Sequence, residues 1–533
     1  MKQKRLKKCL AAILASSLLF SFAGCDKKEE VASGSPVKTS GEKIYPVECE
    51  DSVSVWMALN AQLSTQVTNF GETELAKALE ERTGIKVEYI HPAQGQGSEQ
   101  FNLMIASGEL PDVIQWNWAG YGAQTAIDSK YILSLNDVFD KWAPNVKALL
   151  EKNQDIDKMV KTDAGTYYVF PSLRGSKIDC VYTGLIIRQD YLDKLNMDVP
   201  ETMDEWEAVL KGFKNEIGVS IPFSCMNSYL ADLFAGAWGV KSGFYIDDNG
   251  KVQYGPSQDA YFDYLTKMNQ WYEEGLLDSN IAGVDSNTIT SNMLSDKLGA
   301  TVGTAAGSVG KWTLAMKDRN ADFKLVGAPS PVLKKGERPQ FAIRDWDYLT
   351  SSSFAITGQC KNPELAARFL DYGYSEEGSM LYNFGLEGVT YEMKDGEPAF
   401  TELIMNNPDG KDISTALSPY TMSSYSGPFM QDPRVVEIMQ SVPKQSREAV
   451  LTWADTDMEK HQIPLVSMTY DESREYANAM SEVSTYVNEM TMKFIVGIEP
   501  LENWSVYKER LGKFGIDRAI EIYQGAVDRY NKR

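Results

Sequence analysis

Two tryptophans, Trp116 and Trp118, stand at the end of an apolar run in the sequence PDVIQWNWAGYG. An indole ring offers a flat apolar face and one N–H donor, which are the features needed to stack against a ligand. If a strand continues through this stretch, residues two apart point to the same side. We therefore predict that Trp116 and Trp118 both contact a ligand. The alternative is that one of them packs beneath a helix.

Two further tryptophans lie beside small residues. Trp312 follows the turn-like sequence ATVGTAAGSVGK, and Trp238 lies in AGAWGV, where Gly236 and Gly239 would let another group approach closely. We predict that Trp238 and Trp312 also contact the ligand. Five tryptophans fall in helical patterns and are interpreted as packing residues: Trp142, Trp206, Trp271, Trp453 and Trp504.

Charged residues surround Trp346 in the sequence IRDWDY. Arg344, Trp346 and Asp347 combine a cation, a ring and an acid, which would suit a polyol, although an ion pair between two lobes explains them equally well. Arg174, which follows the strand-like sequence TYYVFPSL, could bind ligand hydroxyls or a uronate, or could hold a hinge in place. Weaker polar candidates are Asn60 and Asn227.

Motifs for catalysis and metal binding are incomplete. The chain has two histidines, so a His-based triad or metal site is not expected. GTAAGSVGKW lacks the first glycine of a phosphate-binding loop, and Trp312 stands where Ser or Thr must hold Mg²⁺. DDNG lacks the other ligands of an EF-hand, which favours a hairpin turn. We expect no cofactor, no metal and no enzymatic activity, although 74 acidic residues leave a pair of glycosidase carboxylates open.

The chain is long and acidic. Its 533 residues are too many for one hydrophobic core, so two lobes are expected. A formal charge of -21 argues against nucleic-acid binding, because phosphate contacts need clustered Lys and Arg. No CxxC pair occurs, and we expect the four cysteines of the body to be buried free thiols.

Strand and helix patterns alternate at the start of the body. Residues 52–60 alternate like a strand, a helix is predicted within 69–84, and residues 85–92 form a second strand. Residues 99–116 repeat the helix and the strand. This order predicts a parallel sheet with helical crossovers, in which ligands bind beyond the carboxyl ends of the strands. The residues at these ends include Asn60, Trp116 and Trp118.

A second α/β segment begins near residue 184. Thr202 and Glu205 form the pattern of a helix capping box, and YIDDNGKVQYG at 245–255 predicts a hairpin with an Asn-Gly turn. The last part of the chain is amphipathic and helical. We assign residues 47–168 and 345–388 to a first lobe, and residues 169–344 and 389–533 to a second lobe with C-terminal helices.

The N-terminal sequence has the pattern of an export signal. MKQKRLKK is basic, CLAAILASSLLFSF is a short apolar run, and small residues precede Cys25. The residues before Cys25 are similar to a bacterial lipobox, apart from Phe22, where leucine is usual. We predict a signal peptide at 1–24, lipidation of Cys25 and a polar, flexible tether at 25–46. The alternative is a plain signal peptide with an incidental Cys25.

Five stretches resemble, in order, the extracellular solute-binding proteins of ABC importers, in the carbohydrate-binding group that includes maltose-binding proteins. TGIKVEYIHP resembles that family's early helix-to-strand passage, and LPDVIQWNWAGYGAQTAIDSKYILSL resembles its strand and ligand loop. ATVGTAAGSVGKW resembles its turn before a ligand-stacking tryptophan, here Trp312. NPELAARFLDYGYSEEGSMLYNFG resembles its late helix pair, and KFIVGIEPLENWSVYKERLGKF resembles its Gram-positive lipoprotein branch.

The resemblance implies an α/β fold of two lobes, the type II periplasmic-binding-protein-like fold, with a mostly parallel sheet in each lobe and a ligand cleft between them. It implies a monomeric lipoprotein on the extracellular face of the cell membrane. This lipoprotein would capture a carbohydrate, expected to be an oligosaccharide, and deliver it to the permease subunits of an ABC transporter. Sugars suit the candidate site because their C–H faces stack on aromatic rings and their hydroxyls bond polar side chains. The alternatives are a secreted glycoside-active enzyme and a binder of a non-sugar solute such as a peptide.

Overall fold

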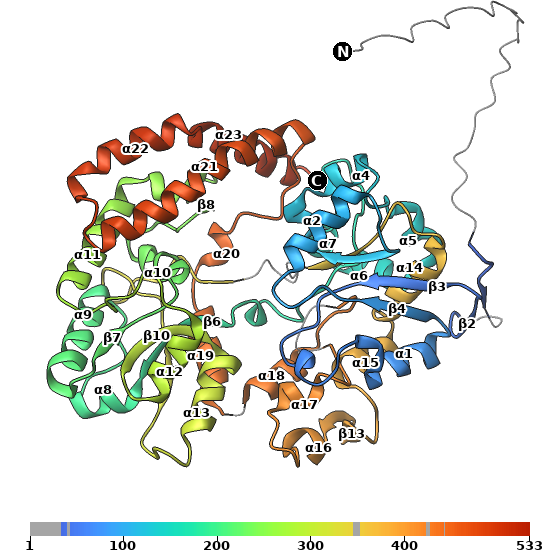
Figure 1. Cartoon of the computed structure of the whole chain (residues 1–533), viewed down its shortest axis with the longest axis horizontal. Helices are drawn as coiled ribbons and strands as arrows, with labels where there is room; N and C mark the ends of the chain where they lie inside the picture. Colours follow the sequence, from blue (N-terminus) through green and yellow to red (C-terminus); the bar gives the residue numbers. More distant parts are fainter. Residues whose placement is uncertain (1–33, 40–42, 345–351, 423–426, 442) are drawn as a thin grey trace, which may run out of the picture.

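The chain folds into two lobes that lie side by side and are joined by crossing segments (Figure 1). The computed structural model describes residues 34–39, 43–344, 352–422, 427–441 and 443–533. Each lobe contains one four-stranded sheet and has its own hydrophobic core. The two-lobed α/β fold predicted from the sequence is confirmed.

The sheet of lobe 1 has the strand order β12-β5-β3-β4. Its strands are β3 (Ser52–Trp56), β4 (Lys86–Ile90), β5 (Val113–Trp116) and β12 (Ser353–Ile356). β3 is parallel to β4 and β5, whereas β12 runs antiparallel to β5, so that Ser353 lies opposite Trp116. The carboxyl ends of the three parallel strands therefore share the edge of the sheet at which β12 begins.

Two helices, α1 (Glu74–Thr83) and α2 (Gly97–Ser107), make the crossovers between the parallel strands of lobe 1. The Thr73 hydroxyl accepts a backbone hydrogen bond from the first turn of α1 and so caps this helix. Gly84 ends α1 at φ +73°, in the left-handed region that glycine adopts without a steric cost. The predicted alternation of strand and helix in this part of the chain is confirmed.

The sheet of lobe 2 has the strand order β11-β6-β10-β7. Its strands are β6 (Thr183–Arg188), β7 (Ile221–Phe223), β10 (Leu298–Thr304) and β11 (Leu325–Ala328). β7, β10 and β11 point the same way, because β10 is parallel to β7 and both β10 and β11 are antiparallel to β6. Thr304, at the carboxyl end of β10, lies opposite Thr183, the first residue of β6.

Two local predictions in lobe 2 are confirmed. The capping box of Thr202 and Glu205 begins α9 (Met203–Gly212). Strands β8 (Phe244–Ile246) and β9 (Val252–Tyr254) form the predicted hairpin. Both features depend on residues that are close in sequence, which is why the sequence pattern was sufficient to find them.

The chain crosses between the lobes three times: between Val169 and Thr183 (the first crossing), between Ile343 and Ser353 (the second crossing) and between Gly427 and Gln445 (the third crossing). Phe170 of the first crossing pairs with Phe354 of β12, and Leu173 pairs with Met430 of the third crossing. The Gln431 N–H donates to the carbonyl of Leu173 at 2.8 Å. We call these paired residues, 170–175 and 427–431, the neck.

Helix α19 (Gln445–Ala454) returns the chain from the third crossing to lobe 2 and lies on its sheet. The indole of Trp453 occupies the space above Gly184 of β6 and Gly327 of β11, since a Cβ there would lie 2.4 Å and 3.1 Å from it, respectively. Its Nε1 donates to the carbonyl of Leu185 at 2.9 Å. The missing side chains of these two glycines, on adjacent strands, therefore leave the space in which α19 packs on the sheet.

Residues 389–422 and 427–431 pack beside lobe 1, whereas the sequence assigned them to lobe 2. The backbone N–H of Leu75, in α1, donates to the carbonyl of Pro419 at 3.1 Å. A small apolar cluster joins the segment to α15 (Glu376–Phe384), which belongs to lobe 1. Figure 1 shows α16 (Glu402–Met405), in orange, below the same lobe. Because these contacts join parts of the chain that are distant in sequence, no local sequence pattern predicts them.

Residues 34–39 are bound to lobe 1, which corrects the predicted flexible tether at 25–46 for this segment. The Ser35 backbone N–H donates to the Asp51 carboxylate at 2.6 Å, and the Ser35 hydroxyl donates to it at 2.8 Å. The side-chain amide of Asn362 donates to the carbonyl of Ser35 at 2.9 Å. Asp51 immediately precedes β3, so the segment is attached at the amino end of that strand.

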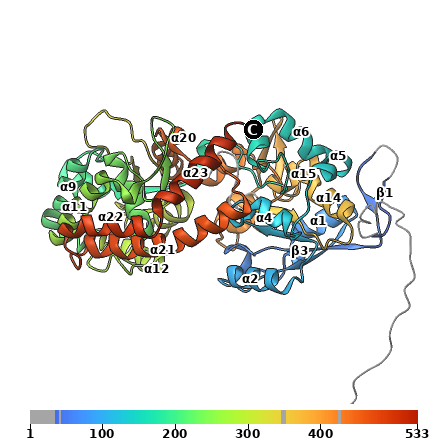
Figure 2. The ribbon, with the colours of Figure 1, turned by 90° about the horizontal axis from the view of Figure 1, so that it is seen from above.

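Three helices at the end of the chain pack on lobe 2, as the amphipathic sequence predicted. They are α21 (Tyr470–Ile495), α22 (Trp504–Lys513) and α23 (Ile516–Tyr530), and we call them the C-terminal helices. Their apolar faces extend the core of lobe 2. Figure 2 shows, from above, that α21 and α23 reach from lobe 2 toward lobe 1.

Among the residues that the structure describes, no helix combines the length and the apolar character needed to cross a membrane. The four cysteines of the body form no disulfide among the described residues. Cys180, Cys225 and Cys360 are buried, as predicted, whereas Cys49 is only half-buried. Burial raises the pKa of the Cys225 thiol, which keeps it protonated.

Candidate ligand-binding site

The crossing segments connect two particular edges of the sheets. In lobe 1 the second crossing enters β12 at Ser353, beside Trp116 at the carboxyl end of β5. In lobe 2 the first crossing enters β6 at Thr183, beside Thr304 at the carboxyl end of β10. The carboxyl ends of the parallel strands of both lobes therefore lie on the sides that the crossings join. We call these two borders the facing edges, and they are where open α/β sheets bind ligands.

Trp116 lies at the facing edge of lobe 1 and is half-buried. One face of its indole is covered by Phe101 of α2, whose ring is inclined by 10° with the ring centroids 4.0 Å apart. Trp56 approaches the same indole at 5.9 Å in a tilted arrangement. Two aromatic neighbours thus fix the orientation of the Trp116 ring while part of its surface stays accessible, which is the geometry that a ligand-stacking ring needs.

Trp118 lies in the core of lobe 1, against the prediction that it contacts a ligand. It is 1% exposed, and its Nε1 donates to the carbonyl of Ile114 at 3.2 Å. The physical reason is that β5 ends at Trp116 and α3 (Trp118–Tyr121) begins two residues later, capped by the Asn117 side chain. The alternation of a strand no longer applies once the helix begins, so Trp118 turns inward.

Trp312 is also buried, which corrects the prediction carried by the family resemblance. It is 3% exposed and lies in α13 (Lys311–Met316) within an apolar cluster of lobe 2. Residues 305–310 form a wide helical turn that runs directly into α13, instead of an open loop. The indole is therefore part of the packing of lobe 2 and has no face for a ligand.

Trp238 is half-buried and packs against the core of lobe 2. The sequence suggested that Gly236 and Gly239 leave room for another group. A Cβ at Gly236 would lie 3.5 Å from Phe341, and one at Gly239 would lie 3.4 Å from Oε1 of Gln340. The group that approaches these two glycines is therefore the protein's own segment at Gln340 and Phe341, which leads into the second crossing.

Arg174 holds the neck together. Its Nη1 donates to Oε1 of Gln431 at 3.3 Å, which links the first crossing to the third. Its guanidinium carbon lies 5.3 Å from the ring centroid of Tyr182, a cation–π distance. These contacts support the predicted role of Arg174 in holding the hinge, and not its alternative role in binding ligand hydroxyls or a uronate.

Tyr182 is a candidate that the sequence analysis missed. It directly precedes β6 at the facing edge of lobe 2, and it is 36% exposed. Its carbonyl accepts a hydrogen bond from the backbone N–H of Ala305, just beyond β10, at 3.0 Å. The available signal was an aromatic residue immediately before the strand that follows the first crossing.

The two asparagine candidates lie at the facing edges of different lobes. Asn60 follows β3, and its Oδ1 accepts a hydrogen bond from the Leu63 N–H at 2.7 Å. The Asn60 Nδ2 is shielded and has no hydrogen-bond partner among the described residues. Asn227, in lobe 2, is exposed, begins α10 (Asn227–Phe234) and donates to the carbonyl of Ala282 at 3.4 Å.

Three predicted site residues, Trp346, Asp347 and the lipidation candidate Cys25, lie outside the described residues. Arg344 is half-buried and is the last described residue before residues 345–351. Because Phe341 and Ala342 belong to the core of lobe 2, Arg344 lies where the second crossing leaves that lobe.

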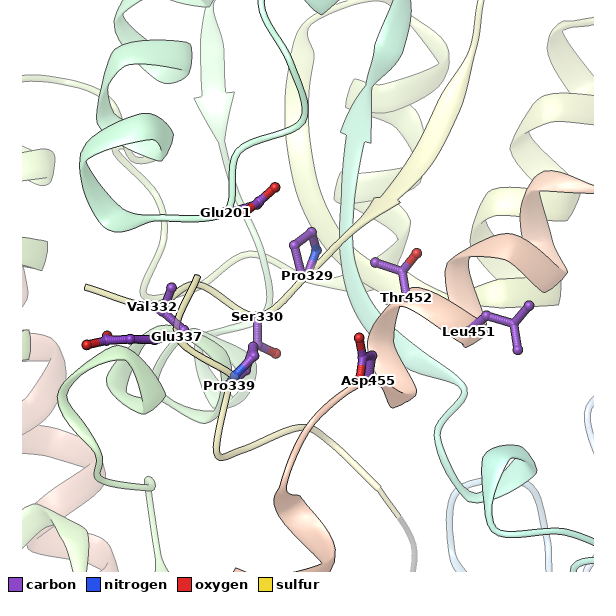
Figure 3. A pocket seen from close by; sticks show the side chains of 9 residues that line it. All are labelled: Glu201, Pro329, Ser330, Val332, Glu337, Pro339, Leu451, Thr452 and Asp455. Carbon is purple, nitrogen blue, oxygen red and sulfur yellow. The ribbon is translucent and has the colours of Figure 1, made fainter. Parts of the chain in front are cut away.

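A pocket of about 480 Å³ lies beyond the carboxyl end of β11 (Figure 3). Its lining includes Glu201 and Asp455, together with apolar residues such as Leu451. Arg338 pairs with Asp455 at 2.9 Å, and Lys335 lies 4.0 Å from Glu201, so both acids have cationic partners. No aromatic side chain and none of the predicted site residues lines this pocket, although β11 ends at the facing edge of lobe 2.

Both histidines are bonded to the backbone. Nδ1 of His91 bonds the carbonyl of Met57 at 2.8 Å, and Nε2 accepts from the Phe70 N–H at 3.0 Å. Burial lowers the pKa of His91, and the bond to Met57 opposes this only in part. His461 is 4% exposed and bonds the carbonyl of Ile246 at 2.8 Å. Within the described part of the chain, no three His, Cys, Asp or Glu side chains are grouped to hold a metal ion.

Two relatives match nearly the whole chain. The fructooligosaccharide ABC transporter substrate-binding protein FusA of Streptococcus pneumoniae is 24% identical, and the match covers 99% of each chain. The lipoprotein LipO of Bacillus subtilis is 24% identical over 98% of this chain and 96% of its own.

Solved structures share the fold. The alginate-binding protein AlgQ2 superposes with a TM-score of 0.74 at 24% identity, covering 90% of this chain and 98% of AlgQ2. FusA in complex with kestose gives a TM-score of 0.74 at 22% identity, covering 90% and 100%. The model of the family described as bacterial extracellular solute-binding protein matches residues 68–380, more than half of the chain. The chain therefore belongs to the bacterial extracellular solute-binding protein family.

Proposed function

We propose that the protein captures an oligosaccharide between its two lobes and delivers it, uncleaved, to the permease of an ABC transporter. The observation that carries this proposal is Trp116, a ring held by Phe101 on one face and accessible at the facing edge of lobe 1. Tyr182 supplies an exposed ring at the facing edge of lobe 2. We assign to it the ligand-stacking role that the sequence had suggested for the buried Trp312. The relatives support a sugar, since the names of FusA and AlgQ2 specify fructooligosaccharide and alginate.

The two candidate rings can supply only part of the free energy of binding an oligosaccharide. A sugar that covers about a third of an aromatic ring contributes on the order of 1–2 kcal/mol per stack. Micromolar binding needs about 8 kcal/mol net. Two stacks therefore supply about 2–4 kcal/mol, and charge-assisted hydrogen bonds, at about 1.5–3 kcal/mol each, must supply the rest and offset the costs of association.

A thermal-shift screen tests the proposal. The panel contains kestose, alginate oligosaccharides, neutral oligosaccharides of other linkages and a set of short peptides. A ligand at 100 times its Kd adds about 2.7 kcal/mol of stability, so the melting temperature should rise with one class of oligosaccharide. A rise with peptides alone would contradict the sugar, and products after prolonged incubation with that oligosaccharide would show an enzyme.

We also propose that Cys25 carries a lipid and that residues 26–33 connect it to the folded body. Nine residue steps separate Cys25 from Gly34, the first described residue, and they span at most about 30 Å. Because residues 34–39 are attached at the amino end of β3, the facing edge of lobe 1 lies at the opposite end of the sheet from the anchor.

Lipidation is tested in the bacterial host with Cys25→Ala. The wild-type protein should partition into the detergent phase of a Triton X-114 separation, because acyl chains contribute about 0.8 kcal/mol per buried CH₂. The Cys25→Ala protein should move to the aqueous phase or the medium. Equal partitioning of both proteins would show that Cys25 is not the anchor.

We propose that ligand binding needs no calcium. The names of related structures mention an EF-hand in FusA and a calcium ion for AlgQ2. In this chain, Asp247 of the β8–β9 turn accepts from the backbone N–H groups of Asn249 and Lys251 and from the Gln253 amide. Its carboxylate is therefore engaged in the turn, and its neighbours do not fit a calcium loop.

The expected result is that EDTA and millimolar calcium give the same melting temperature and the same oligosaccharide affinity. Calorimetric titration with calcium measures this directly and should show no binding heat. A rise in melting temperature with calcium that EDTA reverses would contradict the proposal.

A further inference from the structure

The C-terminal helices belong to lobe 2, yet the end of the chain lies on lobe 1. α21 and α23 contribute buried residues to the core of lobe 2. In Figure 1, the C-terminus lies beside α7 (Gln154–Met159) of lobe 1, above the crossing segments. The two lobes are thus in contact at a place that is separate from the neck.

Arg529, in the last turn of α23, binds both lobes at once. Its Nε donates to Oδ2 of Asp163, in lobe 1, at 2.7 Å. Its Nη1 and Nη2 donate to the two carboxylate oxygens of Glu472, at the start of α21, at 3.0 Å and 2.6 Å. Arg529 therefore links the C-terminal helices to lobe 1 through a three-residue ion network.

The side chain of Arg533, beyond the end of α23, donates its hydrogen bonds to lobe 1 and lies 4.8 Å from the ring centroid of Tyr530 in α23. Its Nε donates to Oδ1 of Asp163 at 2.9 Å, and its Nη2 donates to the same oxygen at 2.5 Å. Its Nη1 donates to the carbonyls of Lys161 at 2.7 Å and Lys158 at 3.1 Å. Only 8% of the Arg533 side chain is exposed, so these bonds are largely shielded from water and salt.

The receiving surface on lobe 1 is an ordered turn. Lys161 pairs with Tyr167 across this turn, and the Thr162 N–H donates to the carbonyl of Thr166 at 3.0 Å. Three residues after Tyr167 the chain enters the neck at Phe170. The turn that receives Arg533 is therefore close in the chain to the first crossing.

We propose that Asp163, Arg529 and Arg533 form a latch that restricts the separation of the lobes. The neck lets one lobe rotate on the other, and such a rotation displaces distant points more than points near the axis. A bonded contact away from the neck must therefore break or move when the lobes separate. With the latch formed, the lobes keep the spacing seen here; with the latch released, they move apart on this side.

The latch deepens the proposed function, because the lobe equilibrium sets the apparent affinity for any ligand held between the lobes. The test is nevertheless made without ligand. It therefore succeeds or fails independently of the oligosaccharide screen.

Inter-lobe distances measured by electron–electron double resonance test the latch. Labels are placed at the exposed positions Ser129, in lobe 1, and Lys251, in lobe 2, in a background in which Cys49 is serine. In Asp163→Asn the distance distribution should broaden and its mean should lengthen, because two arginines lose their carboxylate. Arg533→Gln, a second variant at the end of the chain, should shift the distribution in the same direction.

The matched control is Arg518→Gln. Arg518 also lies on α23, but it pairs with Glu475 and Glu521, both within the C-terminal helices, at 3.0 Å and 3.1 Å. This variant should keep the wild-type distribution. The latch is refuted if Asp163→Asn and Arg533→Gln both fold and both reproduce the wild-type distances, or if Arg518→Gln moves them equally.

Discussion

Trp116→Ala is expected to weaken oligosaccharide binding about 5- to 30-fold and to leave the fold intact. The loss corresponds to one stacked ring, about 1–2 kcal/mol. The ring is half-buried at the facing edge, so its removal opens a surface depression and leaves the packing of the core in place. Isothermal titration with the oligosaccharide selected by the thermal-shift screen measures the effect.

Two further variants make the Trp116 experiment specific. Trp116→Phe retains a flat ring and should recover part of the affinity. Trp142→Ala removes another half-buried tryptophan of lobe 1, which ends helix α5 (Asn136–Trp142) instead of a strand of the sheet, and should bind like wild type. If Trp116→Ala keeps the wild-type affinity, the aromatic site at the facing edge is wrong.

Trp118→Ala is expected to lower the free energy of unfolding by about 3–5 kcal/mol, the range measured for large-to-small changes at fully buried aromatic residues. Trp118 is 1% exposed and packs edge-on against Phe101 at a centroid distance of 5.6 Å. Its removal leaves a cavity in lobe 1 and leaves the Ile114 carbonyl without the indole donor. Urea unfolding followed by circular dichroism measures the effect.

The Trp118 variants also distinguish packing from binding. Trp118→Phe fills most of the cavity and should cost clearly less than the alanine. The folded Trp118→Ala protein should bind the ligand with nearly wild-type affinity, provided that Trp116 keeps its place. If the Trp118→Ala protein is stable but binds the ligand much more weakly, Trp118 contacts the ligand and the assignment to the core is wrong.

Trp116 and Trp118 show what a local sequence pattern can and cannot predict. The sequence PDVIQWNW correctly indicated a strand, which ends at Trp116, whereas the stacking of Trp116 on a ligand stays a prediction. The equal treatment of Trp116 and Trp118 failed because it assumed that the strand continues, whereas Asn117 caps a helix. Asn117 was the available signal, since asparagine is favoured at helix starts.

Trp312 and Arg174 illustrate a different limit. The turn before Trp312 matches the family pattern, but its compact helical turn directs the indole into the core of lobe 2. Arg174 bonds Gln431, which lies far away in sequence but adjacent in the neck. Whether a tryptophan or an arginine is free for a ligand depends on such distant neighbours, which periodicity does not contain.

Local chemistry along the sequence determined the alternation of strands and helices, the capping box at Thr202, the β8–β9 hairpin and the helical C-terminal end. Each depends on hydrogen bonds and side-chain periodicity within a few residues, so the sequence contains the necessary information. Only the tertiary structure decided which aromatic rings are buried, where residues 34–39 and 389–422 attach, and that Asp163 meets Arg529 and Arg533. The physical reason is that these outcomes depend on contacts beyond the reach of a local pattern, from Phe101 against Trp118 in one lobe to Asp163 and Arg529, which are 366 positions apart.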